Sequence, residues 1–374
     1  MQAFHRGPED EGLRGRYPGS MKIAAVGDLL LSGSLEEGRD SDSVFASLRN
    51  VFSTCDLVIG NLECTLDGGG EMISTEPRVI ASPGLMQVVA RGGFDALSLA
   101  NNHMFDCLES GFLQVKRTLR QYGIAGFGAG ENLAEAAAPA IVVRKGMHIA
   151  LLAAADESSG AAVWAGENSP GINPFNIDRM EDQVRRIRAH VDHVIVCLHW
   201  GRERMTIPSP MQVQQGRLLA EAGATMVIGH HPHVIAGAEM HAGAAIAYSL
   251  GNFVACDVPY VCGDELCWNR RERTGCLLLA DLNADSLACI KQVATFDPGL
   301  AVRPDNSGFG RRCIERANKA LQKGISLGRY RRSYFWINTV IPTFGHLRPS
   351  RLGSLRPRHV RNALLHALES ARAQ

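Results

Sequence analysis

Short apolar segments that end in Gly, Asp, Asn or His constrain the fold of this chain more than any other feature. Strands buried on both faces of a sheet are typically this short and this rich in Val, Ile, Leu and Ala. Segments with helical periodicity separate several of them, at residues 111–122, 177–189 and 212–223. Strands that alternate with helices predict an α/β fold with covered sheet faces. The six apolar segments are residues 23–27, 57–60, 96–100, 149–154, 194–198 and 226–229.

The pattern changes in the second half of the domain. Four apolar segments follow one another there with no helix between them, at residues 233–241, 244–249, 276–282 and 287–295. Two of the connections are tight turns, at residues 242–243 and 283–286, which predicts antiparallel pairing. Residues 256–274 form a long charged insertion, and loops of this length are usually functional or mobile.

The charge distribution divides the chain into unequal parts. The 374 residues carry a net charge of only +1, but residues 302–374 contain 15 Lys and Arg against 3 Asp and Glu, a net charge of +12. The first 301 residues carry 24 and 35, a net charge of −11. We therefore expect a flexible N-terminal extension at residues 1–20, a main domain at 21–301 and a basic C-terminal extension at 302–374. Residues 358–371 of that extension have a helical pattern.

The cysteines and the apolar content indicate a compartment. None of the ten cysteines stands in a CxxC pair, and several lie in apolar segments, which favours buried, reduced thiols. Cys256, Cys262 and Cys267 share one loop, but their irregular spacing argues against a metal site. Residues 1–20 lack an apolar leader, and no run of about 18 apolar residues occurs, so the chain is expected to be cytoplasmic.

The basic C-terminal part suggests an anionic partner. Arg329, Arg331 and Arg332 are interleaved and followed by aromatic residues. A solvated appendage packed through its aromatic side chains explains this composition, and so does contact with an anionic membrane surface, a synthase complex or a polyanionic substrate. Sequence-specific nucleic-acid binding is not expected, because no recognised motif is present.

Polar residues suited to chemistry follow the strand-like segments directly, where α/β folds build their sites. Each has an ordinary explanation when taken singly, as a turn or helix-capping residue. Together, two carboxylates, an Asn-His pair and three further histidines form a set of oxygen and nitrogen ligands. Such a set suits one or two divalent ions of Mn, Fe, Zn or Mg. Two ions would activate water and hold a phosphoryl oxygen. The segments are residues 27–28, 60–63, 101–106, 199–203 and 229–233.

The order of these motifs resembles the CapA family, also called poly-γ-glutamate capsule biosynthesis proteins. The motifs read GD, GNxE, NNHxxD, HWGxE, GHHPH and SLGNF, the last at residues 249–253. Together they extend from about residue 21 to residue 281. That family is similar to calcineurin-like phosphoesterases. The resemblance therefore implies a four-layer α-β-β-α sandwich of metallophosphoesterase type for residues 21–301, followed by the basic appendage.

The resemblance also implies roles for individual residues. His103 would be the acid that protonates the leaving group. Asp106 and Glu203 would complete the catalytic set as partners of ligands or of substrate. Candidate substrate-binding residues are Asn101, Asn252 and Arg202. The implied metal ligands are Asp28, Glu63, Asn102, His199, His231 and His233.

The chain departs from the family patterns at three positions. Leu30 stands where the superfamily has the histidine of GDxH, so one ligand is missing. Glu63 takes the place of the bridging Asp, and Leu108 stands where the CapA family usually has Gly.

The resemblance implies a metal-dependent phosphoesterase-like hydrolase that makes or processes an anionic polymer such as poly-γ-glutamate capsule. The alternative is a non-catalytic metal-binding assembly factor for capsule or polymer synthesis. The missing histidine at Leu30 favours the assembly factor, whereas the retained ligands and His103 favour the enzyme. A soluble anion-binding module acting through the basic C-terminal part is a third hypothesis.

Overall fold

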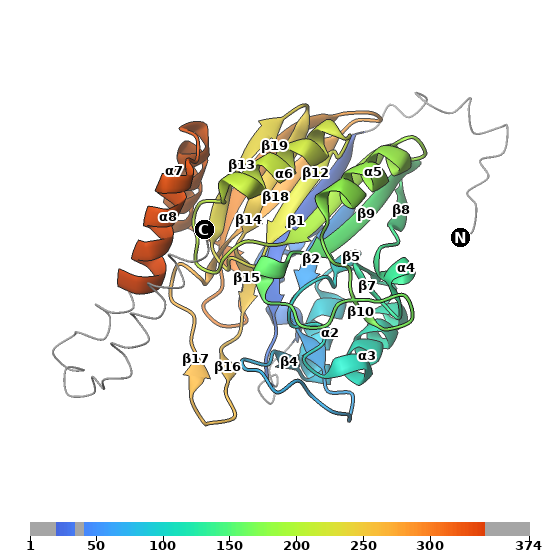
Figure 1. Cartoon of the computed structure of the whole chain (residues 1–374), viewed down its shortest axis with the longest axis vertical. Helices are drawn as coiled ribbons and strands as arrows, with labels where there is room; N and C mark the ends of the chain where they lie inside the picture. The colour runs from blue at the N-terminus through green and yellow to red at the C-terminus, as the bar shows by residue number, and fades with distance from the viewer. Residues whose placement is uncertain (1–19, 34–40, 341–374) are drawn as a thin grey trace.

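The computed structural model describes residues 20–33 and 41–340 (Figure 1). The segment 358–371 and nearly all of the predicted N-terminal extension lie outside these residues. Two large sheets form the body of the described part. The first contains, in spatial order, β20 (Arg303–Pro304), β19 (Leu287–Phe296), β18 (Thr274–Leu282), β1 (Met21–Leu30), β2 (Leu57–Leu62), β5 (Ala96–Ser98) and β6 (Ala125–Phe127). The second contains β13 (Ile235–His241), β14 (Ala244–Leu250), β12 (Met226–His230), β11 (His193–His199), β9 (Met147–Ala155) and β8 (Ala140–Arg144).

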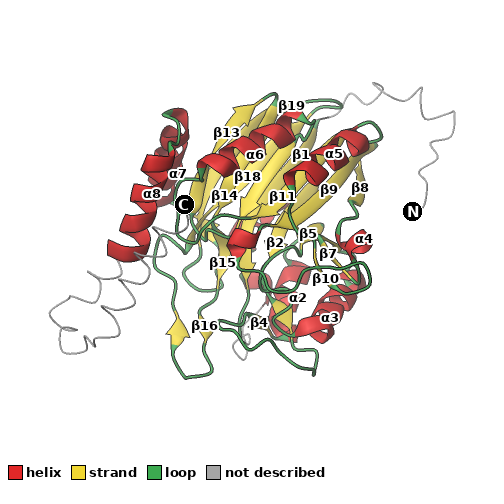
Figure 2. Ribbon diagram, in the orientation of Figure 1, coloured by secondary structure: helices red, strands yellow, loops and turns green. Residues whose placement is uncertain are grey.

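The two sheets pack face to face, and helices cover their outer faces (Figure 2). Alternate residues of β1 point to opposite sides, as a strand requires. Ile23 packs between the sheets with Leu151 of β9, whereas Val26 packs on the outer face with Val88. This predicted α-β-β-α sandwich is confirmed. The outer helices are α1 (Arg49–Phe52), α2 (Pro83–Arg91) and α3 (Leu108–Gln121) on the first sheet, and α5 (Ile177–Arg188) and α6 (Pro210–Glu221) on the second.

The strand directions follow the sequence pattern, and the two tight turns join antiparallel pairs as predicted, β13 with β14 and β18 with β19. In the first sheet β1, β2, β5 and β6 are parallel, and in the second β9, β11, β12 and β14 are parallel. The predicted antiparallel half is divided between the sheets, because β13 pairs with β14 whereas β18 pairs with β1. Hydrophobic periodicity identifies a strand without naming its distant neighbour, so this division was not predictable.

Shorter elements connect the layers. The SLGNF motif ends β14 and, after Gly251, contributes β15 (Asn252–Ala255), which runs parallel to β1 with Asn252 opposite Asp28. The charged insertion forms a small hairpin of β16 (Val258–Pro259) and β17 (Glu265–Leu266). The remaining elements are β3 (Thr65–Leu66), β4 (Ile80–Ala81), β7 (Ala129–Gly130), β10 (Gly171–Ile172), α4 (Leu133–Ala136), and the 3-10 helices η1 (Ser41–Ser43), η2 (Ala46–Leu48) and η3 (Glu157–Ser159).

Two helices beyond residue 302 lie along the β13–β19 edge of the body (Figure 1). In α7 (Phe309–Gln322), Ile314 and Ala317 belong to the core between the sheets. In α8 (Leu327–Phe335), which continues into the π-helix η4 (Trp336–Val340), Tyr330 and Tyr334 pack near Met205. The division at residue 301 stays a prediction, but α7 completes the core rather than forming a solvated appendage. None of the helices in the described ranges has the length and hydropathy needed to cross a bilayer.

Gly27 is required by the close approach of β1 to the turn before β15. The Asp28 amide donates a hydrogen bond to the Gly251 carbonyl oxygen at 2.9 Å, and a Cβ atom on Gly27 would lie 1.8 Å from that oxygen. We expect Gly27→Ala to lower the free energy of unfolding by about 1–3 kcal/mol, the usual cost of overpacking. Urea denaturation measures this.

The control is Gly328→Ala, in α8. The nearest atom to its added Cβ would be a side-chain nitrogen of Arg332 at 3.6 Å. Because Ala is the better helix former, this variant should be neutral or gain up to about 1 kcal/mol. Indistinguishable urea midpoints for the two variants would contradict the steric argument.

Candidate metal centre

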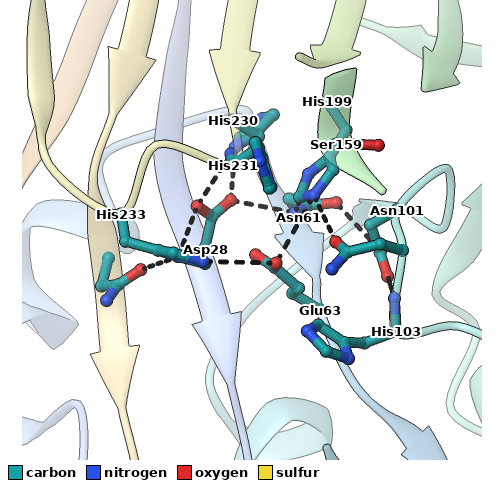
Figure 3. A network of polar contacts seen from close by, with 12 residues as sticks. Asp28, Asn61, Glu63, Asn101, His103, Ser159, His199, His230, His231 and His233 are labelled. Atoms are coloured by element: carbon teal, nitrogen blue, oxygen red, sulfur yellow. Dashed lines mark hydrogen bonds and ion pairs between the residues drawn. The ribbon is translucent and has the colours of Figure 1, made fainter. Parts of the chain in front are cut away.

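The candidate site lies where the carboxyl ends of strands from both sheets meet (Figure 3). Asp28 lies near the C-terminal end of β1, and Glu63 directly follows β2. His199 is the last residue of β11, and His231 and His233 follow β12. All five side chains are buried. The structure thus brings together residues far apart in the sequence, as the strand-end rule predicts.

Asp28 is the most connected side chain of the site. One carboxylate oxygen accepts a hydrogen bond from the Asn61 amide at 2.9 Å and lies 3.0 Å from His230 Nδ1. The other accepts from the His231 backbone N–H at 3.1 Å. Burial alone would raise the pKa of Asp28, but the contact with His230, the nearby His233 and the Asn61 amide outweigh it and lower this pKa. Asp28 is therefore held as a carboxylate.

Glu63 has the opposite surroundings. Both carboxylate oxygens are buried and have no hydrogen-bond partner among the described residues. The nearest ring nitrogens are His199 Nε2 at 3.4 Å and His233 Nε2 at 3.8 Å from Oε1. Burial first, and then the charges of Asp28 and Glu203, raise the pKa of Glu63 well above its usual value. A buried carboxylate without partners is costly unless a cation neutralises it.

Three histidines complete the centre in a form suited to metal. Burial and neighbouring imidazoles lower the pKa of His199 well below its usual value and that of His231 to about 4. Both rings are therefore neutral at physiological pH, as metal ligation requires. His231 Nδ1 is buried without a partner among the described residues. His231 and His233 have left-handed backbones, with φ of 92° and 58°, a conformation that costs energy outside glycine.

The ligand atoms fall into two overlapping groups. Glu63, His231 and His233 form one, and Asp28, Glu63 and His199 form the other, with each group's atoms within 4.8 Å of one another. Glu63 belongs to both, which fits one ion or a pair of ions on either side of it. Leu30 packs in the outer core and adds nothing to the site.

Asn102 and His103 lie beside this centre in different ways. The Asn102 side-chain oxygen lies 2.7 Å from His199 Nε2. It is therefore next to the ligand group that contains His199. His103 Nδ1 lies 2.8 Å from Asp106 Oδ2, an oxygen that also accepts the Val79 backbone N–H at 2.7 Å. Asp106 therefore fixes the imidazole of His103 through its Nδ1 side. Leu108 just beyond has φ of 46°, so the backbone keeps the left-handed shape that the missing family glycine would adopt.

The predicted substrate residues occupy varied positions. Asn101 is buried, donates to Asn61 Oδ1 and the Leu62 carbonyl, and accepts the His103 backbone N–H, so its polar atoms are engaged by neighbours. Asn252 Oδ1 lies 3.0 Å from His233 Nδ1 and orients that ring.

The other two lie in the loop after β11. Arg202 is exposed and lines a cavity of about 610 Å³ with Asp156, Glu157 and Trp164. Glu203 lies beside the centre, where partial burial of its carboxyl group would raise its pKa, but the nearby His233 and His231 outweigh this effect and lower it. Their functional assignments stay predictions.

Two residues that sequence reasoning left without a role complete the site. Asn61 joins Asp28 to His199, with its amide nitrogen 3.3 Å from His199 Nδ1, and His230 contacts Asp28. Both stand inside recognised motifs, at the second position of GNxE and the first histidine of GHHPH. Their position between assigned ligands was the available signal, since metal ligands need partners that orient them.

The α-β-β-α sandwich with ligands at the strand ends defines a protein of calcineurin-like metallophosphoesterase fold, as predicted. A phosphatase of known structure from Mycoplasma pneumoniae shares it with a TM-score of 0.50 at 13% identity, over 75% of this chain and 95% of that one. Residues 22–256 match the profile of the bacterial capsule synthesis protein PGA_cap. The chain belongs to this family, which confirms the predicted CapA resemblance.

Two curated relatives are CapA proteins. The PGA biosynthesis protein CapA of Bacillus subtilis (strain 168) is 31% identical over 240 residues, which cover 63% of each chain. The capsule biosynthesis protein CapA of Bacillus anthracis is 29% identical over 245 residues, covering 63% of this chain and 59% of that protein. The similarity thus spans less than two thirds of the length of these relatives.

Proposed function

We propose that this chain is a metal-dependent phosphoesterase-like hydrolase that acts on an anionic polymer or phosphoester during capsule or polymer synthesis. The observation that carries the proposal is Glu63, a buried carboxylate without a hydrogen-bond partner among the described residues, which belongs to both groups of potential metal ligands. A structural core gains nothing from such an arrangement, whereas a divalent cation would neutralise it. The centre also lies next to His103, a histidine that is not part of either ligand group.

The residues of the site would have three roles, which are to hold the ions, to orient the ligands and to donate a proton. Asp28, Glu63, His199, His231 and His233 would hold one or two divalent ions, with Asn102 beside them. Bound there, such ions supply water activation and neutralise charge on a phosphoryl group. Asn61, His230 and Asn252 orient the ligands. Asp106 holds His103 at Nδ1, which leaves Nε2 to deliver a proton to the leaving oxygen.

The second candidate function is a non-catalytic metal-binding assembly factor, which the position of Leu30 in the core favours. Metal content by mass spectrometry, measured with turnover of bis(p-nitrophenyl) phosphate in added Mn²⁺, tests the two. Bound metal with turnover supports the hydrolase. Bound metal without turnover supports the assembly factor, and failure to bind any divalent ion rejects both.

Contact with an anionic polymer, membrane or synthase complex through the basic C-terminal part is also a proposal. Deleting everything after Val302 would remove Ile314 and Ala317 from the core, so that deletion does not test it cleanly. Deleting residues 341–374 removes six arginines and one Glu while keeping α7 and α8. Loss of poly-γ-glutamate or anionic-vesicle binding, with metal retained, supports the anion-binding role.

A cytoplasmic location, where thiols stay reduced, is proposed on the state of the cysteines. All ten are free, and Cys64, Cys107, Cys197, Cys256 and Cys276 are buried. Burial raises the pKa of the Cys107 and Cys256 thiols to about 11, which makes them unreactive. We expect protein that is denatured in the presence of a thiol-blocking reagent to show ten modified cysteines by intact mass. Two or more intramolecular disulfides would contradict this.

A further inference from the structure

A second polar cavity, which shares no residue with the metal centre, is lined in part by residues of α7 and α8. Figure 1 shows where these two helices lie. Its volume is about 230 Å³. Apolar side chains from the body and from α7 form part of its lining, and three arginines come from three different segments: Arg271 from the loop before β18, Arg316 from α7 and Arg329 from α8. Thr206 and Ser333 add hydroxyl groups, and no carboxylate from the described part of the chain lines the cavity.

The three arginines lack the partners that their neighbours have. Nearby Arg204 pairs with Glu272 at 2.7 Å, Arg273 with Asp257 at 2.6 Å, and Arg311 with Glu315 at 3.7 Å. Among the residues that the structure describes, no carboxylate lies within ion-pair distance of the three cavity arginines.

The rest of the cavity leaves this positive charge uncompensated. Arg329 Nη1 donates to the carbonyl oxygens of Ala320 and Gly324, at 3.1 and 3.2 Å, which anchors its guanidinium at the C-terminal end of α7. Cys313 also lines the cavity, but burial raises the pKa of its thiol despite the nearby Arg271 and Arg316. The thiol is therefore neutral and does not offset the arginines.

We propose that this cavity is a binding site for a phosphate group, separate from the metal centre. Three guanidinium groups and two hydroxyls line one cavity, and backbone carbonyls anchor the guanidinium of Arg329. A phosphate, with about −1.5 to −2 charge and three strong acceptor oxygens, satisfies more of these donors than a carboxylate with −1. The site goes beyond the proposed hydrolase activity, and it can exist whether or not the metal centre is catalytic.

The phosphate could be carried by a small free molecule or by a membrane lipid. The cavity is smaller than the roughly 300–1,000 Å³ of sites for drug-sized ligands, so it suits inorganic phosphate, a small monoester or a headgroup. Leu327, Phe335 and Trp336 on α8 and η4 are 51%, 45% and 58% exposed, beside exposed Arg331 and Arg332. An apolar and basic surface of this kind would suit the lipid source.

The test measures protection of Cys313 in the full-length protein. The rate of its alkylation by iodoacetamide is followed by peptide mass spectrometry, with inorganic phosphate in one arm and phosphatidylcholine vesicles containing phosphatidic acid in the other. At a phosphate concentration about ten times its Kd, alkylation should slow roughly tenfold. Arg271→Gln with Arg316→Gln should abolish the protection, expressed as the ratio of rates with and without the anion.

The control, Arg312→Gln, removes the same charge from an exposed position of α7 that does not line the cavity. It should keep the protection. Protection by phosphate identifies a free ligand, and protection by vesicles alone identifies a headgroup. No protection in either arm, or protection that survives the double substitution, overturns the proposal. Metal content and turnover should be unchanged in the double variant, so failure of the hydrolase proposal is seen separately.

Discussion

Replacing Glu63 with Gln should abolish tight metal binding and, at the same time, make the metal-free protein more stable. The carboxylate is buried with no hydrogen-bond donor among the described residues, and Asp28 adds repulsion. An unsatisfied buried group costs about 1–3 kcal/mol, and more when charged. A neutral amide removes the charge, so we expect the free energy of unfolding without metal to rise by about 1–3 kcal/mol at neutral pH.

The pH dependence gives a second signature of the same residue. The folded-state pKa of Glu63 is raised above its unfolded value, so the metal-free protein should lose stability as the pH rises through the folded-state pKa. Glu63→Gln lacks this loss. The two stability curves should therefore run together below roughly pH 4 and separate as the pH rises. Urea denaturation in the presence of a chelator, repeated across pH, measures this.

The chain contains a matched control for this prediction. Glu272 is also buried, at 1% exposure, but it forms an ion pair with Arg204, with 2.7 Å between Glu272 Oε1 and Arg204 Nε. Glu272→Gln weakens an existing pair and should lower stability, the opposite sign. Metal content should fall only in Glu63→Gln. A stability loss in both variants would show that Glu63 has a structural partner and would remove the main support for the metal centre.

Most of the candidate site was predictable because its residues stand at strand ends. The position of Asp28 after an apolar segment and of the paired histidines after another follows from the rule for parallel sheets. The motif order then assigned a role to each. What the sequence could not show is the contrast between Asp28, which three neighbours contact, and Glu63, which has no hydrogen-bond partner within residues 20–33 and 41–340. That contrast depends on side chains from both sheets.

The role of the C-terminal part was the least predictable feature of the fold. Its net charge suggested a solvated appendage, yet Ile314 and Ala317 of α7 pack between the sheets. A net charge summed over a segment does not show whether one face of a helix is apolar. In α7 the apolar residues recur with a period of about 3.6 and form such a face. The second polar cavity was not predictable either, because Arg271 and Arg316 are 45 positions apart in the sequence and line the same cavity only in the folded chain.

His103→Ala should lower turnover by about 10²–10⁴-fold while leaving metal content nearly unchanged, if the proposed hydrolase acts through this imidazole. His103 lies outside both ligand groups, and Asp106 holds its Nδ1. Asn102→Ala should behave differently. The Asn102 oxygen lies 2.7 Å from His199 Nε2, so removing it should lower metal content and turnover together.

The leaving group separates an acid from a structural residue. A p-nitrophenolate needs no proton to depart, so the effect of His103→Ala should shrink on bis(p-nitrophenyl) phosphate and be full on an alkyl phosphodiester. Asp106→Asn should give a smaller loss in the same direction, because it disturbs the orientation of His103 without removing the imidazole. If His103 only packs at the strand end, His103→Ala will lower the thermal midpoint and leave turnover per folded molecule unchanged. Equal losses on both substrates would argue against proton donation and leave His103 a role in binding.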